Sequence, residues 1–148
     1  MKYQNTLIPG LLLACTLAGH ADMIINPPLK ESPMMVKMNI DDQQFEVKLH
    51  DNPAAKAFVN SLPLQLGMEE LNGNEIFAEL PHKLPSNPVR PGTIQAGDLM
   101  LYGTQTLVLF YESFESSYRY TPIGKVIHPE KLPTSVDKKK IGVRFNDH

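Results

Sequence analysis

Apolar residues recur at every second position in short runs along this sequence, which is the pattern of a strand with one buried face. The run MVKMNI, residues 35–40, has its apolar positions at 36, 38 and 40, and QFEVKL, residues 44–49, continues the alternation at 45, 47 and 49. The polar residues 41–43 between the two runs predict a turn, and therefore a β-hairpin. A chain built from such runs cannot be a helical bundle.

Further runs of this kind bring the number of predicted strands to about eight. They occupy residues 62–68, 71–80, 98–103, 107–114, 121–126 and 140–145. Turn residues separate them at Asn72-Gly73-Asn74, in the proline-rich loop 81–93 and at residues 103–106. The order of the runs has no βαβ rhythm. The sequence therefore predicts a mainly β fold, a closed β-barrel of about eight antiparallel strands, because closure removes exposed strand edges.

One segment has helical spacing instead. Asp51 or Asn52 can cap it, and Pro53 suits its first turn, where the N–H that proline lacks is not needed. Its apolar stripe consists of Ala54, Ala55, Phe58, Val59 and Leu62. A helix with one apolar face is expected to cap the barrel. Pro129 starts a second, short helical turn, so one or two capping helices are predicted.

The N-terminus predicts an export signal over residues 1–21. Lys2 supplies a positive charge, and residues 7–17 form an apolar core too short to span a bilayer stably. Cleavage after Ala21 gives a soluble periplasmic protein. Alternatively, the sequence before Cys15 resembles a bacterial lipobox, which predicts acylation of Cys15 and a lipid-anchored protein. A cytosolic chain with an unstructured N-terminus is the third alternative.

The remaining chain divides in two. Residues 22–34 mix prolines with polar residues and show no period, which predicts a flexible spacer. Residues 35–148 form the predicted barrel domain. The whole chain of 148 residues has a formal net charge of −2, so nothing indicates a nucleic-acid partner. The basic run 138–140 is expected to be a solvated turn.

Several segments together resemble the bacterial cyclophilin-like family, small barrel proteins of unassigned function. They are DNPAAKAF, LPLQLGMEELNGNEIFAELP, PGTIQAGDLMLYG and LVLFYESFESSYRYTPIGKV, in that order. The resemblance covers residues 35–146. It implies an eight-stranded barrel capped by helices, which agrees with the strand count.

A more distant resemblance links the chain to the cyclophilin prolyl isomerases through PGTIQAGD, residues 91–98, and GKVI, residues 124–127. It places Arg90 near the arginine that binds the substrate's prolyl nitrogen in those enzymes. Thr93 stands where their ring-cupping phenylalanine is expected, and the chain contains no tryptophan for the usual proline pocket. The resemblance therefore implies the barrel more strongly than the proline pocket.

Two segments hold the candidate binding residues. In residues 88–98, Arg90 and Gln95 offer a charged donor and an amide suited to a carbonyl or a carboxylate. Residues 110–120, FYESFESSYRY, gather aromatic rings and serine hydroxyls on a predicted connection, where binding residues concentrate. The candidates here are Tyr111, Phe114, Ser117, Tyr118 and Tyr120. They are expected to wall an apolar cleft or, alternatively, to pack over a barrel end.

No catalytic set is recognisable. The serines 113, 116 and 117 lack a Gly-x-Ser-x-Gly elbow, and the histidines 50, 82 and 128 lack metal-ligand spacing. We therefore predict a module that binds a small molecule or an extended peptide, with no cofactor and no metal. A divergent prolyl isomerase of the cell envelope, with Arg90 as its catalytic residue, is the main alternative. A structural or assembly role is a further alternative.

Overall fold

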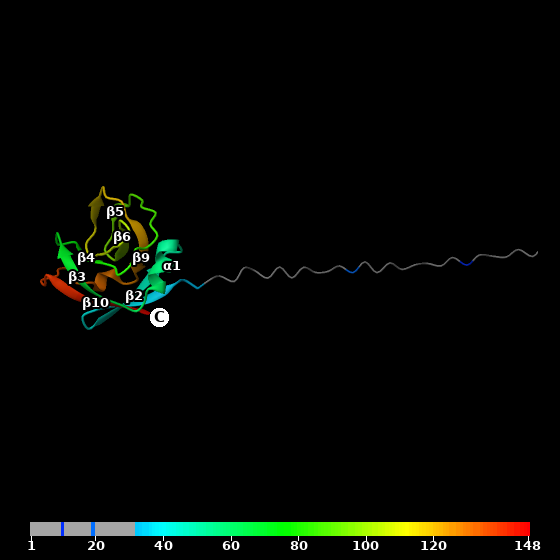
Figure 1. The fold of residues 1–148 in the computed structure, drawn as a ribbon, viewed down its shortest axis with the longest axis horizontal. Helices are drawn as coiled ribbons and strands as arrows, with labels where there is room; N and C mark the ends of the chain where they lie inside the picture. The colour runs from blue at the N-terminus through cyan, green and yellow to red at the C-terminus, as the bar shows by residue number, and fades with distance from the viewer. Residues whose placement is uncertain (1–9, 11–18, 20–31) are drawn as a thin grey trace, which may run out of the picture. The chain divides into compact units, whose positions relative to one another are not determined.

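A computed structural model describes Gly10, Gly19 and residues 32–148 of the chain (Figure 1). The predicted export signal, its alternative lipidation site at Cys15 and most of the spacer lie outside the described residues. The elements in order are β1 (Met35–Ile40), β2 (Gln43–Leu49), α1 (Pro53–Asn60), β3 (Leu64–Leu71), β4 (Glu75–Glu79), β5 (Gly92–Ile94), β6 (Asp98–Tyr102), β7 (Thr106–Phe110), β8 (Phe114–Ser116), β9 (Thr121–Val126), the 3-10 turn η1 (Pro129–Lys131) and β10 (Lys140–Asp147).

Eight of the strands close into a barrel in the order β1-β10-β3-β4-β7-β6-β9-β2. Every neighbouring pair is antiparallel, and β1 completes the ring by pairing with both β2 and β10. Each barrel strand therefore has a hydrogen-bonded neighbour on both sides, which removes the edges that an open sheet exposes. The predicted closed barrel of about eight strands is confirmed.

The alternating positions fill the barrel interior as predicted. Residues 36, 38 and 40 of β1 are buried, as are residues 45, 47 and 49 of β2. Their partners in the core include Met68, Leu99, Leu101, Leu107, Leu109, Ile123, Val143 and Phe145. Because successive side chains of a strand point to opposite faces, each strand supplies this core with every second residue.

Helix α1 packs against this core at Phe58, whose ring meets that of Phe145 edge to face at a centroid distance of 5.3 Å. The Oδ1 atom of Asn52 accepts a hydrogen bond from the N–H of Ala55 at 2.8 Å, so Asn52 is the N-cap. Its Nδ2 atom donates to the carbonyl of Pro122 at 2.8 Å. One amide side chain thus begins the helix and ties it to β9.

Two short segments lie outside the barrel and form what we call the flap, residues 89–96 and 113–120. Within it, β5 pairs with β8, placing Gly92 opposite Ser116 and Ile94 opposite Phe114. An isolated bridge joins Val89 to Tyr120. The sequence predicted a loop up to residue 93 and a single strand over 107–114, whereas β7 ends at Phe110 and Phe114 begins β8. Three-residue strands that pair with a distant segment leave no local period to detect.

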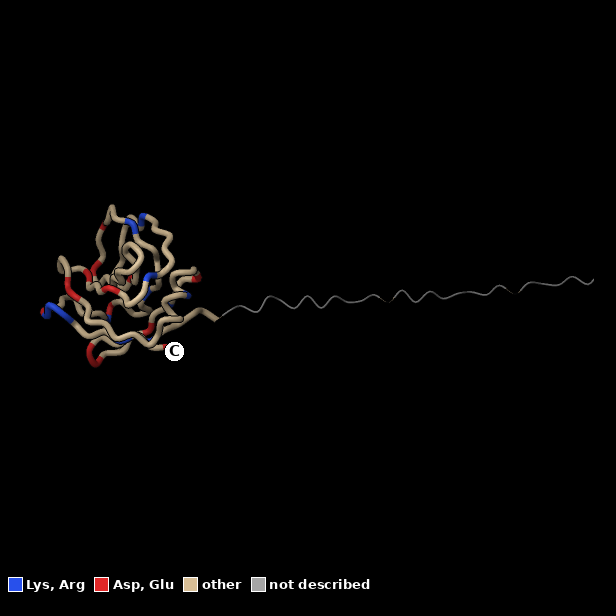
Figure 2. Tube along the Cα trace, in the orientation of Figure 1, with Lys and Arg blue, Asp and Glu red and all other residues tan. Residues whose placement is uncertain are grey.

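The flap covers a second apolar cluster on the outer face of the barrel. Ile94 of the flap and Phe110 of β7 are fully buried there. The other buried members are Met100, Val108 and Tyr120, with Phe77 and Phe114 packed against them. Strands β6 and β7 are therefore apolar on both faces: one face lines the inner core, and the other belongs to this outer cluster. Acidic and basic residues are interspersed along the described chain (Figure 2).

Close packing at Gly124 gives a test of the β2–β9 seam. A Cβ atom added there would lie 2.7 Å from the carbonyl oxygen of Lys48 and 2.9 Å from Cδ2 of Leu49. We therefore expect Gly124→Ala to destabilise the fold by about 1–3 kcal/mol in urea denaturation.

Gly142→Ala is the matched control, because a Cβ atom there would have no atom within 4 Å. Its expected effect is zero or a small gain in stability. Equal stability of the two variants would contradict the packing at the seam.

Candidate functional site

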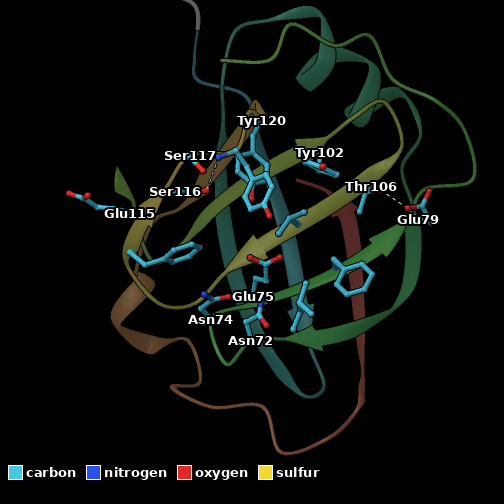
Figure 3. Close-up of a pocket in the computed structure, with 15 residues that line it drawn as sticks. Asn72, Asn74, Glu75, Glu79, Tyr102, Thr106, Glu115, Ser116, Ser117 and Tyr120 are labelled. Atoms are coloured by element: carbon cyan, nitrogen blue, oxygen red, sulfur yellow. Dashed lines mark hydrogen bonds between the residues drawn. The ribbon is translucent and has the colours of Figure 1, made fainter. Parts of the chain in front are cut away.

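A groove of about 530 Å³ lies between the flap and the outer face of the barrel (Figure 3). Its floor comes from β4 and β7, and its wall from Tyr102 at the end of β6 and from residues 114–120 of the flap. The apolar and aromatic lining residues are Leu71, Phe77, Tyr102, Val108, Phe114, Tyr118 and Tyr120. The polar ones are Asn72, Asn74, Glu75, Glu79, Thr106, Glu115, Ser116 and Ser117. The volume is typical of a site for a small molecule.

The floor follows from the two-residue period of β4. Glu75, Phe77 and Glu79 point outward into the groove, whereas Ile76 and Ala78 point into the barrel core. Two of the outward residues are charged, which is the usual composition of a solvated strand face. The flap makes this face a groove floor, so a position that is normally solvated becomes partly buried.

The wall is a continuous series of aromatic contacts. Tyr118 meets Tyr102 edge to face at 6.2 Å, and Tyr102 meets Tyr120 at 5.8 Å. Tyr120 then meets Phe110 at 5.5 Å, and Phe110 meets Phe114 at 5.6 Å. Tyr118 is 62% exposed and Tyr102 48% exposed, whereas Tyr120 is buried. The series therefore runs from the mouth of the groove into the outer cluster, with aromatic faces available at the mouth.

Glu75 occupies the middle of the floor, with its carboxylate directed into the groove (Figure 3). The side chain is half-buried, and within the described residues it has no hydrogen-bond or ion-pair partner. Burial and, secondarily, the charge of Glu70 raise the pKa of Glu75. Burial, followed by the Glu75 carboxylate, likewise raises the pKa of Tyr120. None of the residues described as lining this groove is Lys, Arg or His.

The turn before Glu75 is held from behind by Glu70. Its Oε1 atom accepts hydrogen bonds from the N–H of Gly73 and from the hydroxyl of Tyr111, the latter at 3.1 Å. The carbonyl of Asn74 accepts from the N–H of Tyr111 at 3.0 Å. Asn72 and Gly73 adopt φ values of 58° and 70°, which the Asn-Gly pair tolerates. The turn is therefore fixed where it meets the groove floor.

Four of the candidate residues from the sequence line the groove: Phe114, Ser117, Tyr118 and Tyr120. Tyr111 does not, because it is buried in the inner core with its hydroxyl on Glu70. That bond and burial raise the pKa of Tyr111 to about 12, with burial as the larger cause. Successive residues along a strand point to opposite faces. At the end of β7, Phe110 therefore points into the outer cluster and Tyr111 into the inner core.

Arg90 and Gln95 lie on the flap but do not line the groove. Arg90 is exposed and follows the bridge between Val89 and Tyr120. The Oε1 atom of Gln95 accepts a hydrogen bond from Nζ of Lys125 at 2.5 Å, and its N–H donates to Oδ2 of Asp98 at 2.8 Å. Asp98 thus stabilises the turn that precedes β6. The segments 88–98 and 110–120 are nonetheless side by side, joined by β5 and β8.

The sequence did not identify the floor residues Glu75 and Phe77 or the wall residue Tyr102 as part of a site. The alternation along β4 and β6 does indicate that these three residues point out of the barrel. Nothing in the strand period shows which outward face a distant flap will cover.

The described residues hold no group of three or more His, Cys, Asp or Glu side chains arranged for a metal ion. No helix in the same residues has the length and apolar character needed to cross a membrane.

Comparison with known proteins identifies a family and finds similar solved structures, among them the two that follow. The model of the cyclophilin-like family matches residues 38–146. The hypothetical protein AF2241 from Archaeoglobus fulgidus has a similar solution structure, with a TM-score of 0.51 at 13% identity over 82% of this chain and 100% of that chain. No curated protein matches the sequence.

The second similar structure is McbB in complex with tryptophan, with a TM-score of 0.52 at 13% identity over 76% of this chain. This chain corresponds to 44% of the McbB chain. At such identity both likenesses concern the fold alone.

The bond between Tyr111 and Glu70 gives a test of the floor's support. We expect Tyr111→Phe to lower the free energy of unfolding by about 1 kcal/mol, because a partly buried carboxylate loses one of its donors. Tyr118→Phe, at an exposed ring, is the control with an expected change near zero. Similar values for both variants in urea denaturation would mean that the Tyr111 hydroxyl does not support the turn.

The raised pKa of Glu75 predicts a pH-dependent effect of Glu75→Gln. The folded state binds the proton more tightly than the unfolded chain, whose pKa is 4.5. Protonation of Glu75 therefore contributes fully to the free energy of unfolding below pH 4.5. This contribution is lost as the pH rises through the pKa of Glu75 in the folded state. At pH 7 we expect Glu75→Gln to stabilise the fold, by less than about 1 kcal/mol because the group is half exposed.

The gain should vanish near pH 4 in thermal unfolding, and Glu112→Gln, at an exposed carboxylate outside the groove, should give none at either pH. A loss of stability in Glu75→Gln at pH 7 would show that Glu75 has a favourable partner in the fold.

Proposed function

We propose that this chain, which belongs to the cyclophilin-like family, is a binding module whose groove takes a small molecule with an aromatic or otherwise apolar body. The observation that carries the proposal is the aromatic wall of Tyr118, Tyr102 and Tyr120 above the floor residues Phe77 and Val108. Aromatic rings with polar tips bind such bodies by stacking and edge contacts while their hydroxyls stay solvated.

The size of the groove supports a small ligand. Its volume of about 530 Å³ lies within the range of sites that bury most of a drug-sized molecule. The exposed rings of Tyr118 and Tyr102 stand at the mouth, and the buried members of the outer cluster hold the inner end rigid. A ligand body would therefore find preformed apolar surface, which lowers the entropic cost of binding.

McbB adds support at the level of fold. That protein has been solved in complex with tryptophan, an amino acid with an aromatic body. A protein that contains a domain of this fold thus binds a small aromatic compound, and at 13% identity no residue is transferred from it.

Isomerase activity is not part of the proposal. The distant resemblance places catalysis on Arg90, and a prolyl isomerase needs that arginine beside an apolar cup. Arg90 is exposed and does not line the groove. No specific observation therefore favours the isomerase over a binding module.

We also propose export, on the sequence of residues 1–21 alone. A mature chain starting at Asp22 would be periplasmic, and one starting at an acylated Cys15 would be lipid-anchored. The mass of the mature N-terminal peptide from cells distinguishes these two outcomes from an uncleaved chain.

The binding proposal is tested with 2-phenylethylamine and 2-phenylethanol, two simple probes with the same aromatic body. We expect at least one of them to shift the backbone amide signals of residues 75–79 and 114–120 in ¹H–¹⁵N NMR titrations of the full chain. Tyr118→Ala removes an exposed wall ring at little cost in stability. It should weaken binding about fivefold, or by about 1 kcal/mol.

Arg90→Ala is the matched control, because Arg90 is an exposed residue of the same flap that does not line the groove. It should leave binding unchanged. Failure of both probes to bind, or binding that Tyr118→Ala leaves intact, would overturn the proposal.

A further inference from the structure

Glu75 is a carboxylate held half-buried without a partner. Burying a charge without a partner costs free energy, and proteins normally pair such groups. The other carboxylates around this site do not share its situation. Glu70 accepts the hydrogen bonds of Gly73 and Tyr111 behind the turn. Glu79 accepts from the hydroxyl of Thr106 at 2.5 Å at the far end of the groove.

Glu115 also differs from Glu75, because its side chain extends away from the groove (Figure 3). Glu75 alone among these carboxylates stands in the centre of the floor with its oxygens open to the groove. The groove therefore has one central charge and no neighbouring cation among the described lining residues to neutralise it.

A second acceptor beside Glu75 has no partner either. The Oδ1 atom of Asn74 is fully buried and accepts no hydrogen bond from the described residues. Buried amide oxygens are almost always hydrogen-bonded, so this unpaired one adds a second uncompensated acceptor at the same end of the groove. Asn74 and Glu75 are adjacent in the chain and both line the groove. Of the two, Glu75 is the acceptor that a ligand can reach, because the Asn74 oxygen is closed to solvent.

The aromatic wall suits a positive charge as well. The faces of tyrosine rings attract cations within about 6 Å of the ring centre. Tyr102, Tyr118 and Tyr120 form one contact series, and the Glu75 carboxylate is close enough to Tyr120 to influence its hydroxyl. A cation placed above Glu75 would therefore meet both a carboxylate and aromatic surface.

From this arrangement we infer that the groove recognises a small organic amine, whose ammonium group pairs with Glu75 while its apolar body packs on the tyrosine wall. The inference rests on the proposed binding function and adds the charge and donor character of the ligand. Binding of such an amine supplies the partner that the fold leaves missing. It gives a reason for a half-buried carboxylate without a described partner at the centre of an aromatic groove.

The test compares three probes with the same aromatic body on the full chain: cationic 2-phenylethylamine, neutral 2-phenylethanol and anionic 3-phenylpropanoate. By NMR titration at pH 7 we expect the amine to bind at least about tenfold more tightly than the alcohol, which corresponds to about 1.4 kcal/mol. The propanoate should bind more weakly than the alcohol. The preference for the amine should shrink at high salt.

Glu75→Gln removes the charge and keeps the shape of the side chain. It should abolish the preference for the amine while leaving the alcohol's affinity within about twofold. Glu112→Gln, at an exposed carboxylate that does not line the groove, should keep the preference in full. Glu75→Asp retains the charge on a shorter side chain and should keep part of the preference for the amine.

The outcomes separate the inference from the proposal beneath it. If the alcohol and the amine bind equally well, or if Glu75→Gln keeps the preference, the amine inference is overturned and the aromatic binding site stands. If none of the three probes binds in the groove, the proposed function fails, and the inference fails with it.

Discussion

The outer face of strands β6 and β7 is apolar, and it must be covered. Most barrel strands place their apolar residues inward and expose polar ones, but Met100, Val108 and Phe110 point outward. The β5–β8 flap buries these residues under Ile94, Phe114 and Tyr120, and antiparallel pairing holds its two segments together. Burial of this face places the flap, and the flap in turn creates the groove. The hydrophobic effect that closes the barrel thus also builds its candidate site.

The flap covers β4 only in part, and the chemistry of the groove follows from that limit. Glu75 keeps access to solvent but loses part of its hydration, so its carboxylate carries a raised pKa without a compensating bond. Functional sites commonly hold residues that oppose stability, because their missing partner is the ligand. The turn before Glu75, tied by Glu70 and Tyr111, keeps the backbone that carries Glu75 in place. We interpret this combination as a preorganised site for a positively charged group.

The barrel was predictable from sequence because its signals are local. Alternation at 36, 38 and 40 marks a strand with one buried face, and Asn52 before Pro53 marks the start of the helix. The flap was not predictable, since Gly92–Ile94 is too short for a period and pairs with residues 20 to 24 positions away. Phe114, Ser117, Tyr118 and Tyr120 were identified by composition. Glu75 was not, because an outward charge on a strand normally indicates solvent, and only the tertiary fold covers it.

The most direct test of this account is the pKa of Glu75 itself, followed by the ¹³C shift of its side-chain carboxyl carbon in an NMR pH titration of the full chain. The account predicts a pKa above the usual 4.5 in the free protein. It also predicts that the pKa falls when saturating 2-phenylethylamine is present, because the ammonium group stabilises the carboxylate. An ordinary pKa in the free protein that the amine leaves unchanged would contradict the account, because Glu75 would then be a solvated surface residue.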